Sequence, residues 1–197
     1  MTSSVLDRLC GQIPWCRPAI LDSTLELSLE IAREGREGRR IGTLFTLGKA
    51  DAVLASSRPL ILDPLVGHAP ARTHITDPDL RGTVKELAQL DGAFVISDEG
   101  TVVAACRYLD ASVEEIALPL GLGSRHLAAA SISLSLGAIA IVVSESGVVR
   151  VFHAGHLETA IIPELWLLER HQAQCRGSGS DESVRGAQVL TANHVDA

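Results

Sequence analysis

The chain has 197 residues, a length that suits one well-buried α/β domain with extensions better than two domains. Hydrophobic residues make up 46% of the sequence and aromatic residues only 3%, so we expect an aliphatic core and little aromatic stacking on bases. The formal net charge of −7 argues against a long stretch of DNA or RNA as ligand, because proteins that follow phosphates need a basic surface. A small anion bound by a few local donors remains compatible with this charge.

The cysteines and the N-terminal residues give information about the cellular location of the protein. None of the four cysteines belongs to a C-x-x-C pair or stands near a histidine at zinc-ligand spacing, which argues against a structural metal site and favours reduced thiols. The first residues lack the charged and apolar regions of a signal peptide, and no apolar run reaches the roughly 18 residues of a membrane span. We therefore predict a soluble, cytoplasmic protein without a membrane partner.

The first half of the chain predicts a helix, a strand and a long loop. After an irregular start, Pro18 opens a helix. Four apolar residues recur on one face of this helix: Leu21, Leu25, Leu29 and Ala32. The charged, glycine-containing segment 33–40 predicts a solvated helix end. The apolar run 41–48 predicts a buried strand, residues 52–57 a second strand or a turn, and residues 58–78 a loop.

The second half predicts two helices, each followed by a strand pair. Asp77 caps the first helix, Pro78 begins it, and it ends near Asp91. Residues 93–109 follow as two strands joined by a tight turn. A glycine-rich loop then leads into a helix that begins at about Ser124.

The remaining elements complete the expected fold. We predict a second strand pair over residues 138–155 and a short helix over residues 162–172. Strand pairs between helices indicate a single-domain α/β fold with a mixed β-sheet flanked by helices, rather than a pure βαβ series. We divide the chain into an N-terminal extension and helix (1–40), a central domain (41–171) and a polar tail predicted to be disordered (172–197).

Asp91, Gly92 and Ala93 are the first candidate site group, between a predicted helix and a buried strand. A carboxylate there suits a divalent cation or accepts a proton from a hydroxyl, and the small neighbours let a planar ligand approach the main chain. A helix C-terminus with a glycine stop explains the same residues without a function.

The second group surrounds the start of the helix at Ser124. Gly121 and Gly123 precede it, and free backbone N–H groups at a helix N-terminus bind anions such as phosphate. Arg125 and His126 add a fixed cation and a titratable donor. Packing also accounts for glycines in this position, and the two basic residues also suit a solvated first turn.

The third group, Ser144 and Glu145, ends a buried strand. Ligand groups often lie at strand ends in open α/β sheets, so this position suits a hydroxyl for phosphate and a carboxylate for metal, with a plain turn as the alternative. The chain has neither G-x-G-x-x-G after a strand nor a Walker-type phosphate loop, which argues against ordinary dinucleotide and P-loop sites.

Taken in order, four segments closely resemble the diadenylate cyclase domain of DisA-type proteins: D-G-A (91–93), Y-L-D-A-S (108–112), G-L-G-S-R-H (121–126) and V-V-S-E-S (142–146). The resemblance covers residues 41–164 and implies a mixed sheet with helices on its faces. It also implies that the protein joins two ATP molecules into cyclic di-AMP and releases pyrophosphate, using Mg²⁺ or Mn²⁺. The working form would be a face-to-face homodimer or a higher homo-oligomer, and we see no DNA-binding extension.

The resemblance also implies roles for individual residues. The catalytic residues would be Asp91, which helps activate the 3′-hydroxyl, with Arg125 and His126. The nucleotide would be contacted by Gly92, Ala93, Leu109, Gly123, Ser124, Arg125, His126 and Ser144. The metal would be bound by Asp91 and Glu145.

One residue departs from the family pattern. Where familiar members have R-H-R, this chain has Leu127 after His126, so one guanidinium that would reach phosphate is missing. A nucleotide sensor of ATP or cyclic di-AMP without catalysis is therefore one alternative, and a scaffolding module is another. Asp91 and Glu145 favour catalysis, because a pure binder has little use for carboxylates near phosphates unless a metal lies between them.

Overall fold

The computed structural model describes residues 2–110, 116, 118–119 and 121–168. The helices among these residues are α1 (Thr2–Gln12), α2 (Pro18–Glu34), α3 (Ala50–Ala55), α4 (Pro78–Leu87) and α5 (Ser124–Leu136), with a 3₁₀ turn at Pro70–Arg72. The strands are β1 (Thr43–Leu47), β2 (Ser57–Pro59), β3 (Ala93–Ile96), β4 (Val102–Leu109), β5 (Ile139–Val143), β6 (Val149–His153) and β7 (His156–Ile161). Residues 163–168 form a further helical segment.

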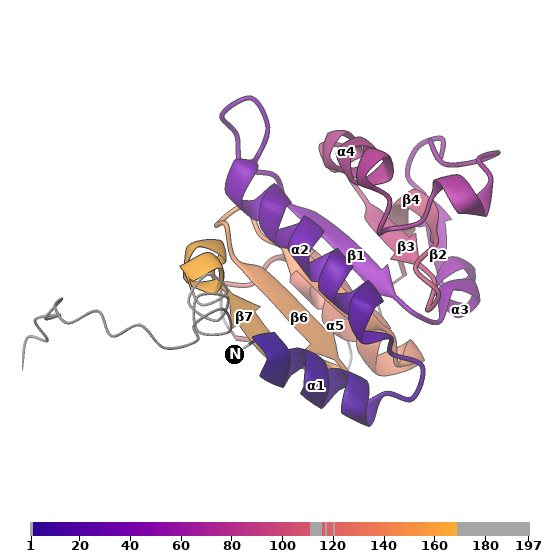
Figure 1. The fold of residues 1–197 in the computed structure, drawn as a ribbon. Helices are drawn as coiled ribbons and strands as arrows, with labels where there is room; N and C mark the ends of the chain where they lie inside the picture. Colours follow the sequence, from indigo (N-terminus) through magenta and orange to yellow (C-terminus); the bar gives the residue numbers. More distant parts are fainter. Residues whose placement is uncertain (1, 111–115, 117, 120, 169–197) are drawn as a thin grey trace, which may run out of the picture.

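The seven strands form one mixed sheet in the order β2-β4-β3-β1-β5-β6-β7 (Figure 1). β1 and β3 are parallel, and every other neighbouring pair is antiparallel. The central strands β1, β3 and β5 are buried along their whole length, which explains their nearly continuous apolar sequences. The predicted α/β fold with a mixed sheet flanked by helices is confirmed.

Each face of the sheet has its own hydrophobic core. Helices α1, α2 and α4 contribute to the first core, in which Phe45 of β1 stacks on Phe94 of β3 with ring centroids 5.1 Å apart. Helices α3 and α5 contribute to the second core, where Leu44 of β1 packs among small α5 residues such as Ala129. Adjacent β1 residues belong to opposite cores because side chains alternate along a strand.

Several predicted elements are confirmed. Helix α2 begins at Pro18. Its four predicted apolar residues are all buried: Leu21, Leu25, Leu29 and Ala32. Asp77 caps α4, because its side chain accepts hydrogen bonds from the backbone N–H groups of Asp79 and Leu80. Helix α5 begins at Ser124, and the two predicted strand pairs are β3–β4 and β5–β6.

Other segments differ from the predictions. The N-terminal segment forms α1 rather than an irregular start, because Leu9 and Ile13 pack into the first core. Residues 50–55 form α3 rather than a strand or turn, because Val53 is buried in the second core beside α5. Strand β7 was not predicted, since an edge strand with exposed and half-buried residues carries a weak apolar pattern.

The cysteines also differ from the expectation of reduced thiols. Cys10 and Cys16 form a disulfide that links the last turn of α1 to the loop before α2, with Cα atoms 4.8 Å apart. Cys106 is a free, buried thiol in β4. Burial raises its pKa, and the neighbouring carboxylates of Asp63 and Asp91 raise it further.

Some predictions lie outside the described residues. These include the tail 172–197 and the last part of the final predicted helix. The domain boundaries at residues 40 and 171 stay predictions. Of the helices in the described ranges, none combines the length and the apolar character that crossing a membrane takes.

Candidate functional site

Two of the candidate groups meet at one edge of the sheet. The C-terminal end of β5 lies beside the N-terminal ends of β1 and β3, because β1 is parallel to β3 and antiparallel to β5. In this register Leu44 pairs with Ala93 on one side and with Val142 on the other. Asp91 comes just before β3 and Glu145 just after β5, so both carboxylates stand at this edge.

Arg125 of α5, from the remaining group, lies between the two carboxylates. Its Nη2 atom is 3.2 Å from Oδ1 of Asp91, and its Nη1 atom is 3.2 Å from Oε1 of Glu145. The Arg125 side chain is 37% exposed, and the Asp91 and Glu145 side chains are 77% and 68% exposed. Exposed ion pairs contribute only about 0–1 kcal/mol, so an incoming phosphate or cation replaces these contacts at little cost.

Gly42, just before β1, makes room for this cluster. A Cβ atom at this position would lie 2.8 Å from Nη1 of Arg125 and 3.2 Å from Oε1 of Glu145. A larger residue would therefore displace the guanidinium or the carboxylate. Gly42 was not predicted from the sequence, because a glycine before a strand carries no local signal of what packs against it.

Gly92 is required by the backbone at this edge. Its φ angle is +110°, and a Cβ atom there would lie 2.6 Å from the carbonyl carbon of Cys106 and 2.8 Å from the backbone nitrogen of Arg107. The Gly92 N–H donates to Oδ1 of Asp91 at 3.0 Å, which helps to orient that carboxylate. Asp91 thus projects from a turn that only glycine allows.

Three neighbouring side chains at the start of α5 lie in different environments. Ser124 is exposed, and Arg125 reaches the carboxylates. His126 is only 7% exposed, and its Nε2 accepts a hydrogen bond from Nη1 of Arg150 at 3.3 Å. Burial lowers the pKa of His126, and the Arg150 and Arg125 cations lower it further, which favours a neutral imidazole.

Two adjoining cavities share Asp91 and Arg125 in their walls. The first, which we name the apolar cavity, has a volume of about 240 Å³. Its walls include Leu44, Leu60, Tyr108, Leu109, Leu127 and Ala128. The second, which we name the arginine cavity, has a volume of about 300 Å³. Its walls include Arg36, Arg39, Arg40 and Glu145.

The structure brings six of the predicted site residues to these cavities. The apolar cavity is lined by Asp91, Gly92, Leu109, Ser124 and Arg125, and the arginine cavity adds Glu145. Four predicted residues line neither of these two cavities: Ala93, Gly123, His126 and Ser144. Ala93 is buried in β3, and the Ser144 hydroxyl accepts hydrogen bonds from Ser146. The roles of all these residues toward a nucleotide stay predictions.

Arg107 and Tyr108 of β4 also line the apolar cavity, and neither was predicted from the sequence. The Arg107 guanidinium donates to the carbonyl oxygens of Leu54 and Ser57 and so joins β4 to α3 and β2. Leu109 was predicted at the site, and alternation along a strand places Arg107 on the same face. This alternation is the sequence signal from which Arg107 could have been predicted.

Comparisons with known proteins agree with a nucleotide-binding domain. The family model described as "DisA bacterial checkpoint controller nucleotide-binding" (DAC) matches residues 30–157. The chain therefore belongs to the DAC family, the diadenylate cyclase domain family.

Two curated relatives are similar over most of this chain. A protein of Methanocaldococcus jannaschii named diadenylate cyclase is 49% identical over 138 residues, which cover 70% of this chain and 43% of the relative. A diadenylate cyclase of Haloferax volcanii is 40% identical over 150 residues, which cover 76% of this chain and 55% of the relative. The chain thus spans about half the length of these relatives.

A solved structure shares the fold. The crystal structure of a double mutant of DacA from Staphylococcus aureus aligns with a TM-score of 0.50 at 24% identity, covering 78% of this chain and 95% of that chain. At this identity the likeness concerns the fold alone.

Proposed function

We propose that this protein is a diadenylate cyclase, which joins two ATP molecules into cyclic di-AMP and releases two pyrophosphates. The observation that carries the proposal is the cluster of Asp91, Arg125 and Glu145 where the apolar cavity meets the arginine cavity. An apolar cavity suits a nucleoside, and guanidinium groups suit its phosphates. The names of both curated relatives support the same activity.

The site residues suit an in-line displacement at phosphorus. The 3′-hydroxyl of one ATP forms a bond to the α-phosphorus of the other, and the bond from that phosphorus to the pyrophosphate oxygen breaks. The exposed carboxylate of Asp91 accepts the hydroxyl proton. Arg125, released from its carboxylate partners, stabilises the charge that develops on the phosphate oxygens.

The donor set fits Mg²⁺ or Mn²⁺. Asp91 and Glu145 already share one cation, the Arg125 guanidinium, so both carboxylates are placed to share another. In the described parts of the chain, no three His, Cys, Asp or Glu side chains gather closely enough to hold a metal without further ligands. Two carboxylates completed by substrate phosphates and water are the usual arrangement for Mg²⁺. Once bound, the ion would offset the negative charge of the leaving pyrophosphate.

The reaction requires two protomers that face each other. The apolar cavity of about 240 Å³ lies below the roughly 300–1,000 Å³ of typical ligand pockets, so one protomer has room for one nucleoside. Leu60 in its wall is followed by Ile61 and Leu62, which are 48% and 93% exposed. Apolar side chains exposed beside the cavity support a homodimer that covers them.

A nucleotide sensor is the second candidate function, and Leu127 favours it. This residue puts an aliphatic side chain in the wall of the apolar cavity, so Arg125 is the one guanidinium that α5 offers to phosphates. A sensor would bind ATP or cyclic di-AMP through the same cavities without turnover.

The test is incubation of the protein with ATP and Mg²⁺ or Mn²⁺, followed by mass spectrometry for cyclic di-AMP and an assay for pyrophosphate. We expect both products from the wild type. Asp91→Asn should lower turnover by about 100-fold or more, because it removes the proton acceptor but keeps the shape of the side chain. ATP binding without product would replace the cyclase with the sensor.

A further inference from the structure

The segment between α2 and β1, residues 36–40, has a role that the proposed function leaves open. It contributes Arg36, Arg39 and Arg40 to the arginine cavity, and we name it the arginine turn. Asp91, Arg125 and Glu145 belong to the walls of the same cavity. The sequence predicts a solvated helix end here. Solvation alone does not explain why three guanidinium groups line a cavity beside the proposed reaction centre.

Two of the three guanidinium groups have no carboxylate partner among the described residues. Arg36 pairs with Glu86 at 2.6 Å. Arg40 donates from Nη1 to the carbonyl oxygen of Ala32 at 3.2 Å, a contact that leaves its charge uncompensated. Arg39 makes no side-chain hydrogen bond or ion pair within the described part of the chain, and it is exposed. Glu37 also lines the cavity, but it forms no ion pair with Arg39 or Arg40. On a chain with a net charge of −7, two unpaired guanidinium groups in one cavity indicate an anionic ligand.

The backbone of the arginine turn is well defined. Arg36 and Arg39 exchange two backbone hydrogen bonds of 2.8 Å each. Glu37 and Gly38 between them have φ angles of +49° and +77°, as in the tight turns that join paired strands. The Arg40 guanidinium also packs against the backbone of Gly147 in the β5–β6 turn, close in sequence to Glu145.

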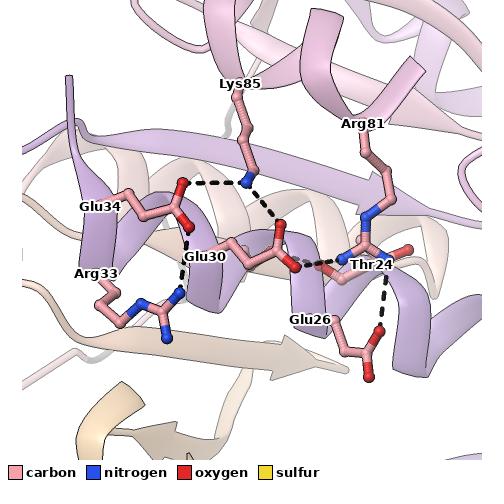
Figure 2. A network of polar contacts seen from close by, with 8 residues as sticks. Thr24, Glu26, Glu30, Arg33, Glu34, Arg81 and Lys85 are labelled. Atoms are coloured by element: carbon pink, nitrogen blue, oxygen red, sulfur yellow. Dashed lines mark hydrogen bonds and ion pairs between the residues drawn. The ribbon is translucent and has the colours of Figure 1, made fainter. Parts of the chain in front are cut away.

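An ion-pair network joins α2 to α4, the two helices that precede the arginine turn and the segment that carries Asp91. Glu30 of α2 binds Arg81 and Lys85 of α4, both at 2.8 Å, and Glu34 binds Lys85 at 3.0 Å (Figure 2). The network joins the C-terminal half of α2, which leads into the turn, to α4, which leads toward Asp91. The arginine turn and the segment before Asp91, which both line the arginine cavity, therefore follow two helices that are connected by ion pairs.

We propose that the arginine turn binds the β- and γ-phosphates of ATP, and the pyrophosphate product, through the side chains of Arg39 and Arg40. This inference rests on the proposed function, because it takes the α-phosphate to lie at Arg125. The two cavities meet at Asp91 and Arg125, so a nucleotide whose nucleoside fills the apolar cavity extends its phosphates into the arginine cavity. Guanidinium groups match pairs of phosphate oxygens in geometry as well as charge.

The experiment compares ATP with AMP, which lacks the outer phosphates, and with inorganic pyrophosphate, which lacks the nucleoside. Calorimetry in EDTA, which prevents turnover, gives the affinities of the wild type for ATP, AMP and inorganic pyrophosphate. Arg39→Gln and the double variant Arg39→Gln/Arg40→Gln follow. The matched control is Arg33→Gln, because Arg33 is exposed on α2, pairs with Glu34 and does not line the cavity.

We expect Arg39→Gln to weaken ATP and pyrophosphate binding by about 10-fold and the double variant by about 100-fold, as loss of charged hydrogen bonds predicts. AMP binding should change less than about 2-fold, because AMP lacks the outer phosphates. Arg33→Gln should bind all three ligands like the wild type. Arg39→Lys should recover part of the affinity, since it restores the charge without the planar fork.

The double variant loses the Arg40–Ala32 contact, and this loss could impair its folding. The single variant Arg39→Gln avoids that problem, because Arg39 contacts no described side chain through hydrogen bonds or ion pairs. Equal loss of ATP and AMP affinity, or no loss of either, would overturn the inference. A wild type that makes cyclic di-AMP while Arg39→Gln binds ATP normally would overturn the inference and leave the cyclase intact. A wild type that binds ATP without turnover, yet shows the phosphate-dependent loss, would overturn the cyclase alone. Absence of ATP and pyrophosphate binding in the wild type would overturn the inference, and absence of cyclic di-AMP from the incubation with Mg²⁺ or Mn²⁺ as well would overturn the cyclase.

Discussion

Gly92 has a backbone conformation that helps to position the carboxylate of Asp91, the proposed catalytic group. Its φ angle of +110° and the backbone of Cys106 and Arg107 leave no room for a side chain. Gly92→Ala should therefore lower the free energy of unfolding by about 2 kcal/mol or more in urea denaturation. Gly82→Ala is the matched control, because Gly82 lies within α4 with open space around it and should gain up to about 1 kcal/mol. Similar effects of the two variants would contradict the close approach at Gly92.

His126 makes folding depend on pH. Its pKa in the folded protein is below the ordinary 6.5, first because of burial and then because of Arg150 and Arg125. Between that lowered pKa and 6.5 the unfolded chain binds a proton that the folded chain does not, so the stabilising contribution of His126 is present above 6.5 and falls with pH below it.

The check is a melting curve from pH 7.5 to pH 5. Tm should fall with pH in the wild type and fall less in His126→Gln, whose side-chain oxygen still accepts from Arg150 without taking up a proton. The same pH slope in both proteins would remove His126 from this dependence.

The α2–α4 contact includes a network of ion pairs beside the shared hydrophobic core. Arg81 is paired with both Glu26 and Glu30, at 3.4 Å and 2.8 Å, and Lys85 with Glu30 and Glu34. Burial by itself raises the pKa of Glu34, but hydrogen bonds from Lys85 and Arg33 outweigh it and lower the pKa. This part of the contact is therefore present above pH 4.5 and lost as the pH falls through the lowered value.

Glu30→Gln tests this contact, because Glu30 is the carboxylate that Arg81 and Lys85 share. Such partly exposed pairs are worth little each, so we expect a loss of about 1 kcal/mol at low salt. The loss should shrink in 1 M NaCl, where the screening length is about 3 Å. Glu99→Gln serves as control, since Glu99 is exposed and its carboxylate pairs with no described cation. A loss that is independent of salt would point to packing rather than charge.

In its described part, each protomer presents the apolar cavity and the arginine cavity, whereas the proposed reaction joins two nucleotides. Because each protomer of the proposed dimer presents one ATP to the other, activity per protomer should fall on dilution below the dissociation constant of the dimer. Turnover measured over a range of protein concentrations, together with sedimentation, checks this. Constant activity per protomer in a sample that sediments as a monomer would contradict the two-protomer reaction.

The sequence was sufficient for elements that local signals define. Asp77 and Pro78 mark the start of α4, the glycines before Ser124 mark the start of α5, and apolar runs mark the buried strands. These signals work because capping, helical periodicity and burial of a central strand each depend on residues within a short window. Asp91 and Arg125 of the candidate site also stand in short motifs, but it was the resemblance of the ordered motifs to a known family that singled them out.

Long-range packing decided the rest. Burial in the first core makes a helix of α1, and only the sheet register sets Gly42 against Arg125 and Glu145. The arginine turn has the composition of a solvated loop, yet it lines a cavity. It follows α2, which is joined to α4 by ion pairs between residues about 50 positions apart. No local pattern records such contacts, because their partners come together only when the sheet and its helices are assembled.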